Sequence, residues 1–456
     1  MSKVKYDWLL GIFVLCFSLY SCGGACPNDD VDYDNVSDVI DNCVSSEPVE
    51  NSDLIDPCTG CKRDTLKITS SKIDNLNVYL EISGSMKGYM PKQTGRSTGF
   101  QKEMASLFSW FVTSVESKSK NFYGIKDDQT TLEFESKDDI ASKISRAEFD
   151  FGKTTTLPDL VEKIIKKNNQ EDVSIIVSDF LYSPPNVLNL EGTLNVRLRE
   201  MFLKRPEMAL SVYAFKSDYS GKFYTVSNQV VENCCNDKRP YYVWVLGKQP
   251  LVEQIDKLIS EKVKFSEELH IGKKYETVQG EILAQSGRNP ESLWQRKSNC
   301  TSIIAEAKYI SEEEKLTYTI GLNLSKLPKQ HQDLEYLKAN LSVRSPNSKS
   351  NINKVYTYKE FEPKVAKEDI VLAKKYTHFV EIETYSVDIP CKASLNLELK
   401  NSLPTWINDW NTESDETDAE RNERTVLLKR VISGIQEAHD NETLFSYPYI
   451  ITASAL

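Results

Sequence analysis

The chain has 456 residues, of which 56 are Lys or Arg and 67 are Asp or Glu, so its net charge at neutral pH is −11. This length suits about three domains, and the acidic balance argues against a surface that binds the phosphates of nucleic acid, so we expect no nucleic-acid partner. With 40% hydrophobic and 27% charged residues and a mean hydropathy of −0.44, the chain should be mostly globular, and a protein with many membrane spans is excluded.

The first segment has the features of an export signal. Lys3 and Lys5 precede an apolar stretch, Trp8–Tyr20, that is too short to span a bilayer. The letters LYSC that close it resemble a bacterial lipoprotein signal, which implies that Cys22 is lipidated and becomes the first residue of the mature protein. We predict a signal peptide over residues 1–21 and a lipid anchor in the bacterial cell envelope, with the outer membrane as the expected location. An ordinary secretory signal is the alternative.

Residues 22–72 are predicted to form an acidic tether. From Cys22 to Cys61 the segment has ten acidic residues and no Lys or Arg, and such a run repels itself and stays extended. The ten cysteines of the chain favour disulfides in an oxidising compartment, with a pairing that the sequence leaves open. Cys58 and Cys61 have CxxC spacing but lie in this polar tether, so a structural bridge is favoured over a redox or zinc role.

Residues 73–270 are predicted to form an α/β domain with a doubly wound, mostly parallel sheet. Short, nearly continuous apolar runs, as in strands covered on both faces, alternate with longer segments of helical period. The predicted strands are Leu76–Ile82, Val173–Val177, Leu210–Phe215 and Tyr241–Leu246. The predicted helices have apolar faces within residues 100–115, 157–165 and 251–259.

Oxygen-bearing side chains follow the strands of this domain. Glu81, Ser83 and Ser85 lie at alternate positions after the first strand, and Asp179 follows the second. Between them, residues 151–158 place hydroxyls on a loop that enters a helix. Ligands of open α/β sheets bind outside the carboxyl ends of the strands, and hard cations such as Mg²⁺ prefer oxygen ligands of this kind. No His or Cys is placed to bind zinc.

The same residues resemble the von Willebrand factor type A (VWA) domain, also called the integrin I-like domain, a Rossmann-like fold. The sequence NVYLEISGSMKGY is similar to its Asp-x-Ser-x-Ser motif, so Ser83 and Ser85 match the two serines, and Asp179 in IIVSDF matches a later aspartate. Thr155 is the choice for the threonine of the family, with Thr154 next. The resemblance implies a metal-ion-dependent adhesion site (MIDAS), in which a divalent cation keeps one coordination position for a carboxylate of a partner.

Glu81 departs from the family, which has Asp at this position. Its additional methylene lengthens an arm at a site where Mg²⁺–oxygen distances are about 2.0–2.1 Å. Two readings follow. In the first, the Glu81 side chain folds back or binds the ion through water, and the site retains Mg²⁺, Mn²⁺ or Ca²⁺. In the second, the domain has kept the fold and lost the ion, and the two serines satisfy hydrogen bonds of the turn.

Residues 271–406 are predicted to form a β-rich, sandwich-like domain. Apolar residues alternate in Leu316–Leu324, in 337–343 and in 393–399, as expected for half-buried antiparallel strands. Aromatic residues of such strands are mostly core residues, so no site is assigned to them. These aromatic residues are Trp294, Tyr318, Tyr336 and Tyr356.

Residues 407–456 are predicted to form an acidic linker and a C-terminal helix. The acidic stretch Glu413–Glu423 precedes a segment with Leu428, Val431, Ile432 and Ile435 on one helical face. Docking of this stripe onto one of the domains is favoured over binding of a partner.

The sequence favours binding over catalysis. The four histidines are scattered, and no HExxH motif, nucleophile elbow or P-loop is present. Lys87 and His270 are expected at the surface. The leading hypothesis is a membrane-anchored binding or adhesion lipoprotein, not an enzyme, whose VWA-like domain engages a carboxylate of a protein or glycan partner through a MIDAS-type cation. A metal-free envelope scaffold is the alternative, and a metal-assisted hydrolase using Glu81 and Asp179 is a weaker one.

Overall fold

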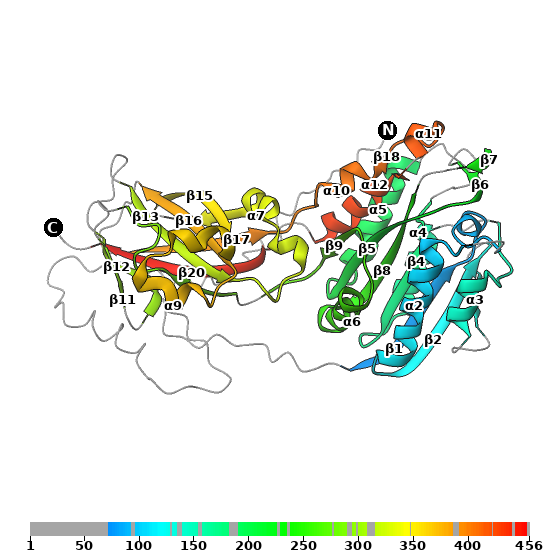
Figure 1. The fold of residues 1–456 in the computed structure, drawn as a ribbon, viewed down its shortest axis with the longest axis horizontal. Coiled ribbons are helices and arrows are strands. Elements are labelled where there is room, and N and C mark those ends of the chain that lie inside the picture. Colours follow the sequence, from blue (N-terminus) through cyan, green and yellow to red (C-terminus); the bar gives the residue numbers. More distant parts are fainter. Residues whose placement is uncertain are drawn as a thin grey trace, which may run out of the picture. The chain divides into compact units, whose positions relative to one another are not determined.

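A computed structural model describes residues 72–92, 96–127, 130–134, 139–153, 157–181, 190–225, 229–234, 238–275, 278–289, 294–297, 300–307, 315–346, 348–385, 392–421, 423–439 and 443–453 (Figure 1). These residues all belong to one compact unit, 51–456. The predicted signal peptide, Cys22 and nearly all of the predicted tether lie outside the described residues. Within the described ranges, no helix has the length and apolarity needed to cross a bilayer.

A seven-stranded sheet has the order β3-β2-β1-β4-β8-β5-β9. Its strands are β1 (Ile73–Glu81), β2 (Ser117–Lys126), β3 (Thr130–Glu133), β4 (Val173–Ser178), β5 (Met208–Ser217), β8 (Arg239–Lys248) and β9 (Glu267–Ile271). β1 pairs in parallel with β2 and β4, and the remaining neighbours pair antiparallel. The α/β class is confirmed, and the parallel arrangement holds at the centre of the sheet. β8 runs antiparallel because it follows β5 through the hairpin β6 (Gly221–Tyr224) and β7 (Val230–Cys234) and not through a crossover helix.

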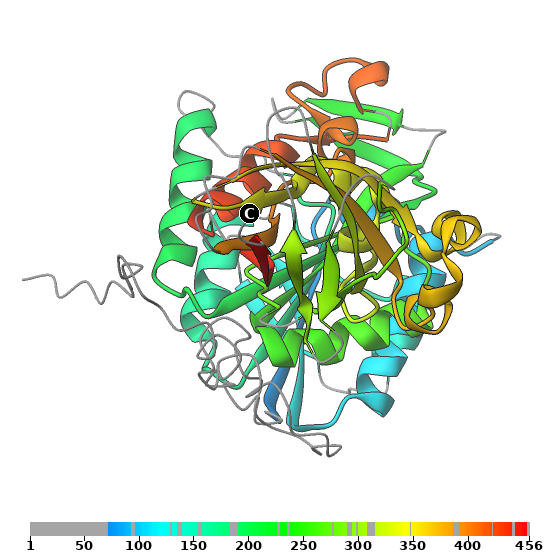
Figure 2. The same ribbon diagram turned by 90° about the vertical axis from the view of Figure 1, so that its left-hand side faces the viewer.

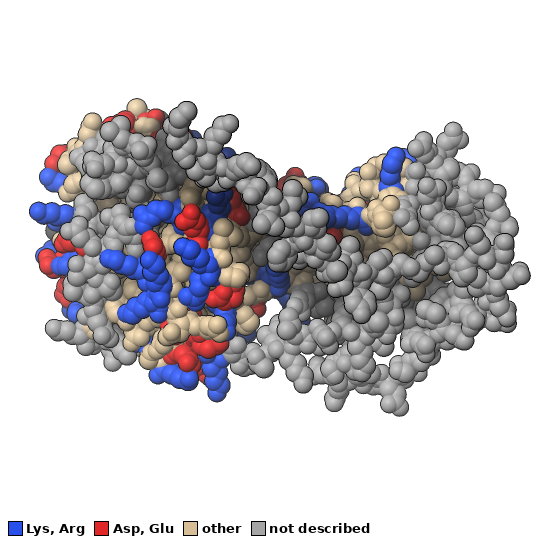
Figure 3. All heavy atoms as spheres, turned by 180° about the vertical axis from the view of Figure 1, so that it is seen from behind, with Lys and Arg blue, Asp and Glu red and all other residues tan. Residues whose placement is uncertain are grey.

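Helices cover both faces of this sheet (Figures 1 and 2). One core contains side chains of α2 (Gly99–Ser114), α3 (Ile140–Arg146) and α6 (Gln249–Lys262). A second core contains side chains of α4 (Leu157–Lys167), α5 (Leu190–Leu203) and α12 (Leu428–Ala438). Every residue of β4 is buried, as its apolar run predicts. On the face drawn in Figure 3, the basic and acidic side chains of the described residues are intermixed.

Two further sheets share one hydrophobic core. The first has the order β10 (Gln279–Ile282), β13 (Leu316–Asn323), β16 (His378–Tyr385) and β15 (Lys349–Thr357). The second has the order β11 (Gln295–Lys297), β12 (Cys300–Ala307), β20 (Thr443–Ala453), β17 (Lys392–Lys400) and β14 (Leu341–Arg344). The four aromatic residues that the sequence assigns to the core are all buried.

Short elements lie between the strands and helices of both regions. They are η1 (Met86–Gly88), η2 (Lys329–Gln332), α7 (Leu334–Asn340), α8 (Tyr358–Phe361), η3 (Glu362–Lys364), η4 (Lys367–Asp369), α9 (Ile370–Ala373), α10 (Trp406–Asp409), β18 (Asn411–Thr412), α11 (Asp418–Arg421) and β19 (Thr425–Val426). The strand predicted over 337–343 is wrong in its first part, which belongs to α7. The Asp333 side chain caps this helix by accepting the backbone N–H groups of Glu335 and Tyr336. Leu337 and Leu341 also have helical spacing, which made the pattern ambiguous.

The C-terminal part differs from the prediction after α12. The helix itself is confirmed and packs on α5, and Trp406 and Trp410 join the same core of the α/β region. The chain then returns to the β-rich region, where β20 lies between β12 and β17. The apolar residues of LFSYPYII explain this strand, since a central strand buries both of its faces.

We expect Gly434→Ala to destabilise the protein. A Cβ atom at Gly434 would lie 2.5 Å from the backbone oxygen of Asn195 on α5, too close for the two helices to keep their spacing. Overpacking of this kind costs about 1–3 kcal/mol, and it should outweigh the higher helix propensity of Ala. Urea unfolding followed by circular dichroism measures the change. Ser433→Ala on the same helix is the control, and equal stability of the two variants would contradict this account of the helix contact.

Candidate functional site

Four of the predicted site residues lie at one edge of the seven-stranded sheet. Leu80 of β1 pairs with Val177 of β4, so the residues that follow these strands emerge side by side. Glu81, Ser83, Ser85 and Asp179 are only 4%, 2%, 7% and 5% exposed. The structure therefore brings them together, but in a buried position.

The fifth predicted residue, Thr155, lies outside the described residues, as does Thr154. The loop that leads to them does reach this edge. The backbone N–H of Gly152 donates to the carbonyl oxygen of Ile82 at 2.8 Å, and a Cβ atom on Gly84 would lie 3.1 Å from the carbonyl oxygen of Lys153.

The two serines and Asp179 form a connected group. The hydroxyl oxygens of Ser83 and Ser85 lie 3.0 Å apart, and the Ser85 hydroxyl hydrogen-bonds to the Asp179 carboxylate. The backbone N–H of Leu181 also donates to Asp179, at 3.1 Å. Two adjacent ligands of an octahedral ion with bonds of about 2.1 Å lie about 3.0 Å apart. The serine spacing alone therefore suits a Mg²⁺ site.

Glu81 is engaged with the neighbouring strand. Its carboxylate accepts a hydrogen bond from the hydroxyl of Ser178, the last residue of β4. That hydroxyl oxygen accepts the backbone N–H of Phe180 at 2.8 Å. Phe180 has a φ of 53°, a left-handed conformation unusual for a bulky residue, and its ring stacks on Trp244 at 4.2 Å. The longer Glu side chain is thus accommodated by a bond to Ser178.

The segment that leads into the β6–β7 hairpin packs against the loop after β1. The Tyr219 hydroxyl lies 3.0 Å from the carbonyl oxygen of Ser85, and the backbone N–H of Ser220 donates to the carbonyl oxygen of Gly88 at 2.9 Å. A Cβ atom on Gly88 would lie 2.2 Å from the Tyr219 ring, so only glycine allows this approach. The contact helps to bury the candidate site.

Arg239, at the start of β8, places a positive charge near Asp179. It is 5% exposed, its guanidinium lies 4.1 Å from the centre of the Phe223 ring, and it donates to the carbonyl oxygen of Arg421 at 2.8 Å. Burial raises the pKa of Asp179 above its usual value, although the hydrogen bonds from Leu181 and Ser85 and the charge of Arg239 act in the opposite direction. The carboxylate already lies in the field of a cation that belongs to the chain.

These observations test whether the site suits a divalent ion. The spacing of Ser83 and Ser85 suits it. The Glu81 carboxylate is hydrogen-bonded to Ser178, which does not fit the role of a metal ligand. A divalent cation would also be repelled by the positive charge of the nearby, buried Arg239. The residues at this edge therefore fit a buried, hydrogen-bonded polar cluster with a positive charge nearby better than they fit a metal ion.

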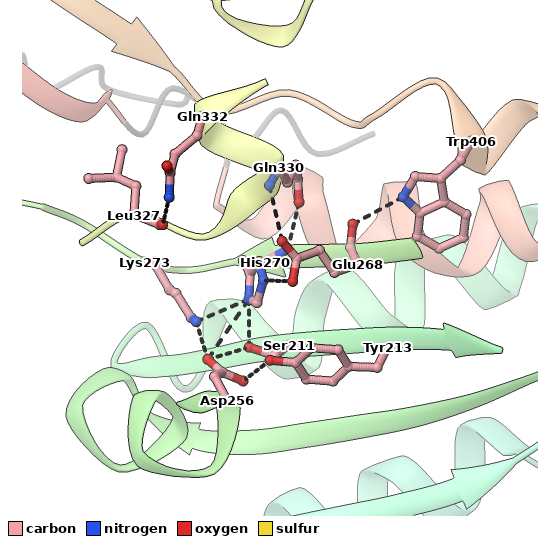
Figure 4. Close-up of polar contacts among 10 residues, drawn as sticks. All are labelled: Ser211, Tyr213, Asp256, Glu268, His270, Lys273, Leu327, Gln330, Gln332 and Trp406. Carbon is pink, nitrogen blue, oxygen red and sulfur yellow. Dashed lines mark hydrogen bonds and ion pairs between the residues drawn. The ribbon is translucent and has the colours of Figure 1, made fainter. Parts of the chain in front are cut away.

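Sequence reasoning missed a second polar cluster, which lies between β5, α6, β9 and η2 (Figure 4). The Lys273 ammonium forms an ion pair with Asp256, which also accepts hydrogen bonds from Ser211 at 3.0 Å and from Tyr213 at 2.8 Å. His270 is 1% exposed, so its predicted surface position is wrong. It lies on an edge strand that η2 covers, and this cover has no signal in the local sequence.

The cluster contains the residue types of a hydrolytic triad. The Ser211 hydroxyl lies 2.8 Å from Nδ1 of His270, and the other ring nitrogen lies 3.5 Å from the Glu268 carboxylate. Ser211 is fully buried and its hydroxyl is shared with Asp256, so a substrate has no access to it. The arrangement fits a structural role.

Glu268 connects three segments of the chain. Its carboxylate accepts the backbone N–H of Gln330 at 3.0 Å, and its carbonyl oxygen accepts the indole N–H of Trp406 at 3.0 Å (Figure 4). The side-chain oxygen of Gln330 accepts the backbone N–H of His270 at 3.2 Å. The cluster thus joins β9 to η2 and to the start of α10.

Comparison with known proteins identifies no relative: no family model matches the chain, and no curated protein or solved structure matches it either. The functional argument therefore depends on the geometry of the two clusters and on the sequence.

Acid should destabilise the protein through His331. Among the residues that the structure describes, neither ring nitrogen of this buried residue has a hydrogen-bond partner, and burial, with the charges of His270 and Lys273, lowers its pKa well below the usual value. The unfolded chain therefore binds more protons below about pH 6.5, and the free energy of unfolding should fall by up to about 1.4 kcal/mol per pH unit for each such histidine. His378, whose pKa is also lowered, acts in the same direction.

Urea unfolding measured from pH 7.5 down to pH 5 tests this expectation. His331→Phe keeps an aromatic ring against Tyr336 and should reduce the pH slope without abolishing it, since His378 remains. An unchanged slope in this variant would show that His331 does not carry the effect.

Proposed function

We propose that this chain is an exported, lipid-anchored binding scaffold of the cell envelope, and that its candidate site is closed and metal-free. One observation carries the proposal. Asp179, which matches the later aspartate of the VWA motif, is buried beside Arg239. Burial raises the pKa of Asp179 in spite of the nearby Arg239 charge, and its carboxyl group is bonded to the backbone N–H of Leu181, so it is enclosed by the chain.

A MIDAS-type site works by offering an open coordination position of a cation to the carboxylate of a partner. Here the Tyr219 hydroxyl bonds to the loop after β1, and the four described oxygen-bearing residues are almost inaccessible. A partner would therefore bind elsewhere on the α/β or β-rich regions. Cys234 is disulfide-bonded, which supports a location in an oxidising compartment.

Calorimetric titration with Mg²⁺ and Mn²⁺ tests the closed site. We expect no heat of binding up to millimolar ion and no change in thermal stability with EDTA. Binding heat that disappears in Ser83→Ala would contradict the proposal.

A double-mutant cycle tests the role of Arg239. Arg239→Met removes the positive charge near Asp179 and the hydrogen bond to the carbonyl oxygen of Arg421, and it should lower the free energy of unfolding by about 1–3 kcal/mol. Asp179→Asn added to it should restore part of this loss, because the uncompensated charge is removed. Additive effects of the two substitutions would show that the residues do not interact.

A cation-dependent adhesion module is the second candidate. The 3.0 Å separation of the Ser83 and Ser85 hydroxyl oxygens favours it, as this is the spacing of adjacent ligands on an octahedral ion. Ser83, Ser85 and Asp179 would then hold the ion, and the bound cation would attract a carboxylate of a protein or glycan partner. The same titration separates the two candidates.

The lipid anchor has its own test. Replacement of Cys22 by Ser removes the thiol to which the lipid would be attached, so the protein should no longer incorporate labelled fatty acid. Metabolic labelling measures this effect, with Cys26→Ser as the matched control. Continued labelling of the Cys22 variant would contradict lipidation at this residue.

A further inference from the structure

The corner formed by η4 and α9 exposes two adjacent aliphatic side chains. Val371 is 79% exposed and Ile370 is 44% exposed. Neither belongs to a core of the described residues, whereas Ala373 on the same short helix is buried with Phe361 and Phe379. α9 is labelled in the β-rich region of Figure 1.

A buried carboxylate fixes this corner in place. Asp369, which is fully buried, accepts the backbone N–H groups of Ala284, Gln285 and Ser286, each at 2.8 Å. The Ser286 hydroxyl donates to the same carboxylate and accepts the backbone N–H of Ala366 at 3.0 Å. The exposure of the aliphatic pair is therefore a fixed property of the fold and not the result of a frayed helix end.

The surroundings of the pair are basic, although the whole chain has a net charge of −11. Residues 362–375 have two exposed acidic residues, Glu362 and Glu368, and a larger number of exposed lysines. The exposed basic residues of this stretch are Lys364, Lys367, Lys374 and Lys375. The exposed aliphatic pair is thus flanked in sequence by more exposed lysines than exposed acidic residues, on a protein that anionic surfaces otherwise repel.

We propose that this corner binds the surface of an anionic lipid bilayer, with Ile370 and Val371 entering between the headgroups and the lysines contacting lipid phosphates. Two aliphatic side chains are far too few for a specific protein interface, which buries about 1,200–2,000 Å². They suit an interfacial contact, in which a few apolar groups and flanking cations act together. Lysine stems are long enough to keep their charges at the phosphates while the aliphatic pair is inserted.

The test uses the mature chain from residue 22 with Cys22→Ser, so that no lipid anchor contributes to binding. Its outcome is therefore independent of the proposed scaffold function. We expect the protein to co-sediment with vesicles of phosphatidylcholine and phosphatidylglycerol in equal amounts, and not with phosphatidylcholine alone. Ile370→Glu with Val371→Glu should weaken binding at least about tenfold, because the apolar contact becomes a repulsion.

Leu203 on α5 provides a matched control, since it is 55% exposed and is followed by the exposed Lys204. Leu203→Glu should bind vesicles like the unsubstituted chain. In a second measurement, Val371→Trp should add a fluorescence component that shifts to the blue on anionic vesicles, whereas Leu203→Trp should not. This shift reports insertion directly and does not depend on a loss of binding.

Several results would overturn the proposal. Equal binding to neutral and anionic vesicles would do so. So would a Leu203→Glu variant that binds vesicles as weakly as the double variant Ile370→Glu, Val371→Glu, or a Val371→Trp variant whose fluorescence does not shift on anionic vesicles. If the glutamate substitutions at Ile370 and Val371 instead convert a dimer to a monomer in analytical ultracentrifugation without lipid, the corner is a contact between copies of the chain.

Discussion

A buried carboxylate must find its compensation inside the protein, and the edge of β1 and β4 is built around this constraint. Asp179 is buried, and an uncompensated buried charge costs several kcal/mol, about 3–5 when a partner is lost. Arg239, the first residue of β8, acts on it through its charge and donates a hydrogen bond to the carbonyl oxygen of Arg421. One guanidinium therefore bonds the antiparallel strand inserted in the sheet to the C-terminal segment and places its charge near the candidate site.

The same requirement recurs at two other buried carboxylates. Asp256 is compensated by Lys273 and two hydroxyls, and Asp369 by three backbone N–H groups and a hydroxyl. In each case the partners come from segments distant in sequence. These acidic residues act as connectors of the fold, which explains how groups typical of catalytic sites occur where no substrate can enter.

The sequence predicts the elements of the α/β region well because each strand there is covered on both faces and each helix has one apolar stripe. It also places Glu81, Ser83, Ser85 and Asp179 at one edge, since parallel strands end together. It does not predict the burial of this edge, because Tyr219 and Arg239 flank the β6–β7 hairpin, whose position depends on tertiary packing. His270 was misjudged for the same reason: η2, which covers it, lies about 60 residues away in sequence.

The return of the chain to the β-rich region has a consequence for how the protein is made. β20 lies inside the five-stranded sheet, yet it is synthesised after the residues of α12 that complete a core of the α/β region. The segments of the two regions therefore alternate along the chain, and no single division of the sequence separates one region from the other. β12 and β17 can pair with β20 only after β20 has been synthesised. Such late long-range pairing is slow and leaves the edges of these strands unpaired in the meantime. If the chain is exported as proposed, these edges need protection until translocation has finished.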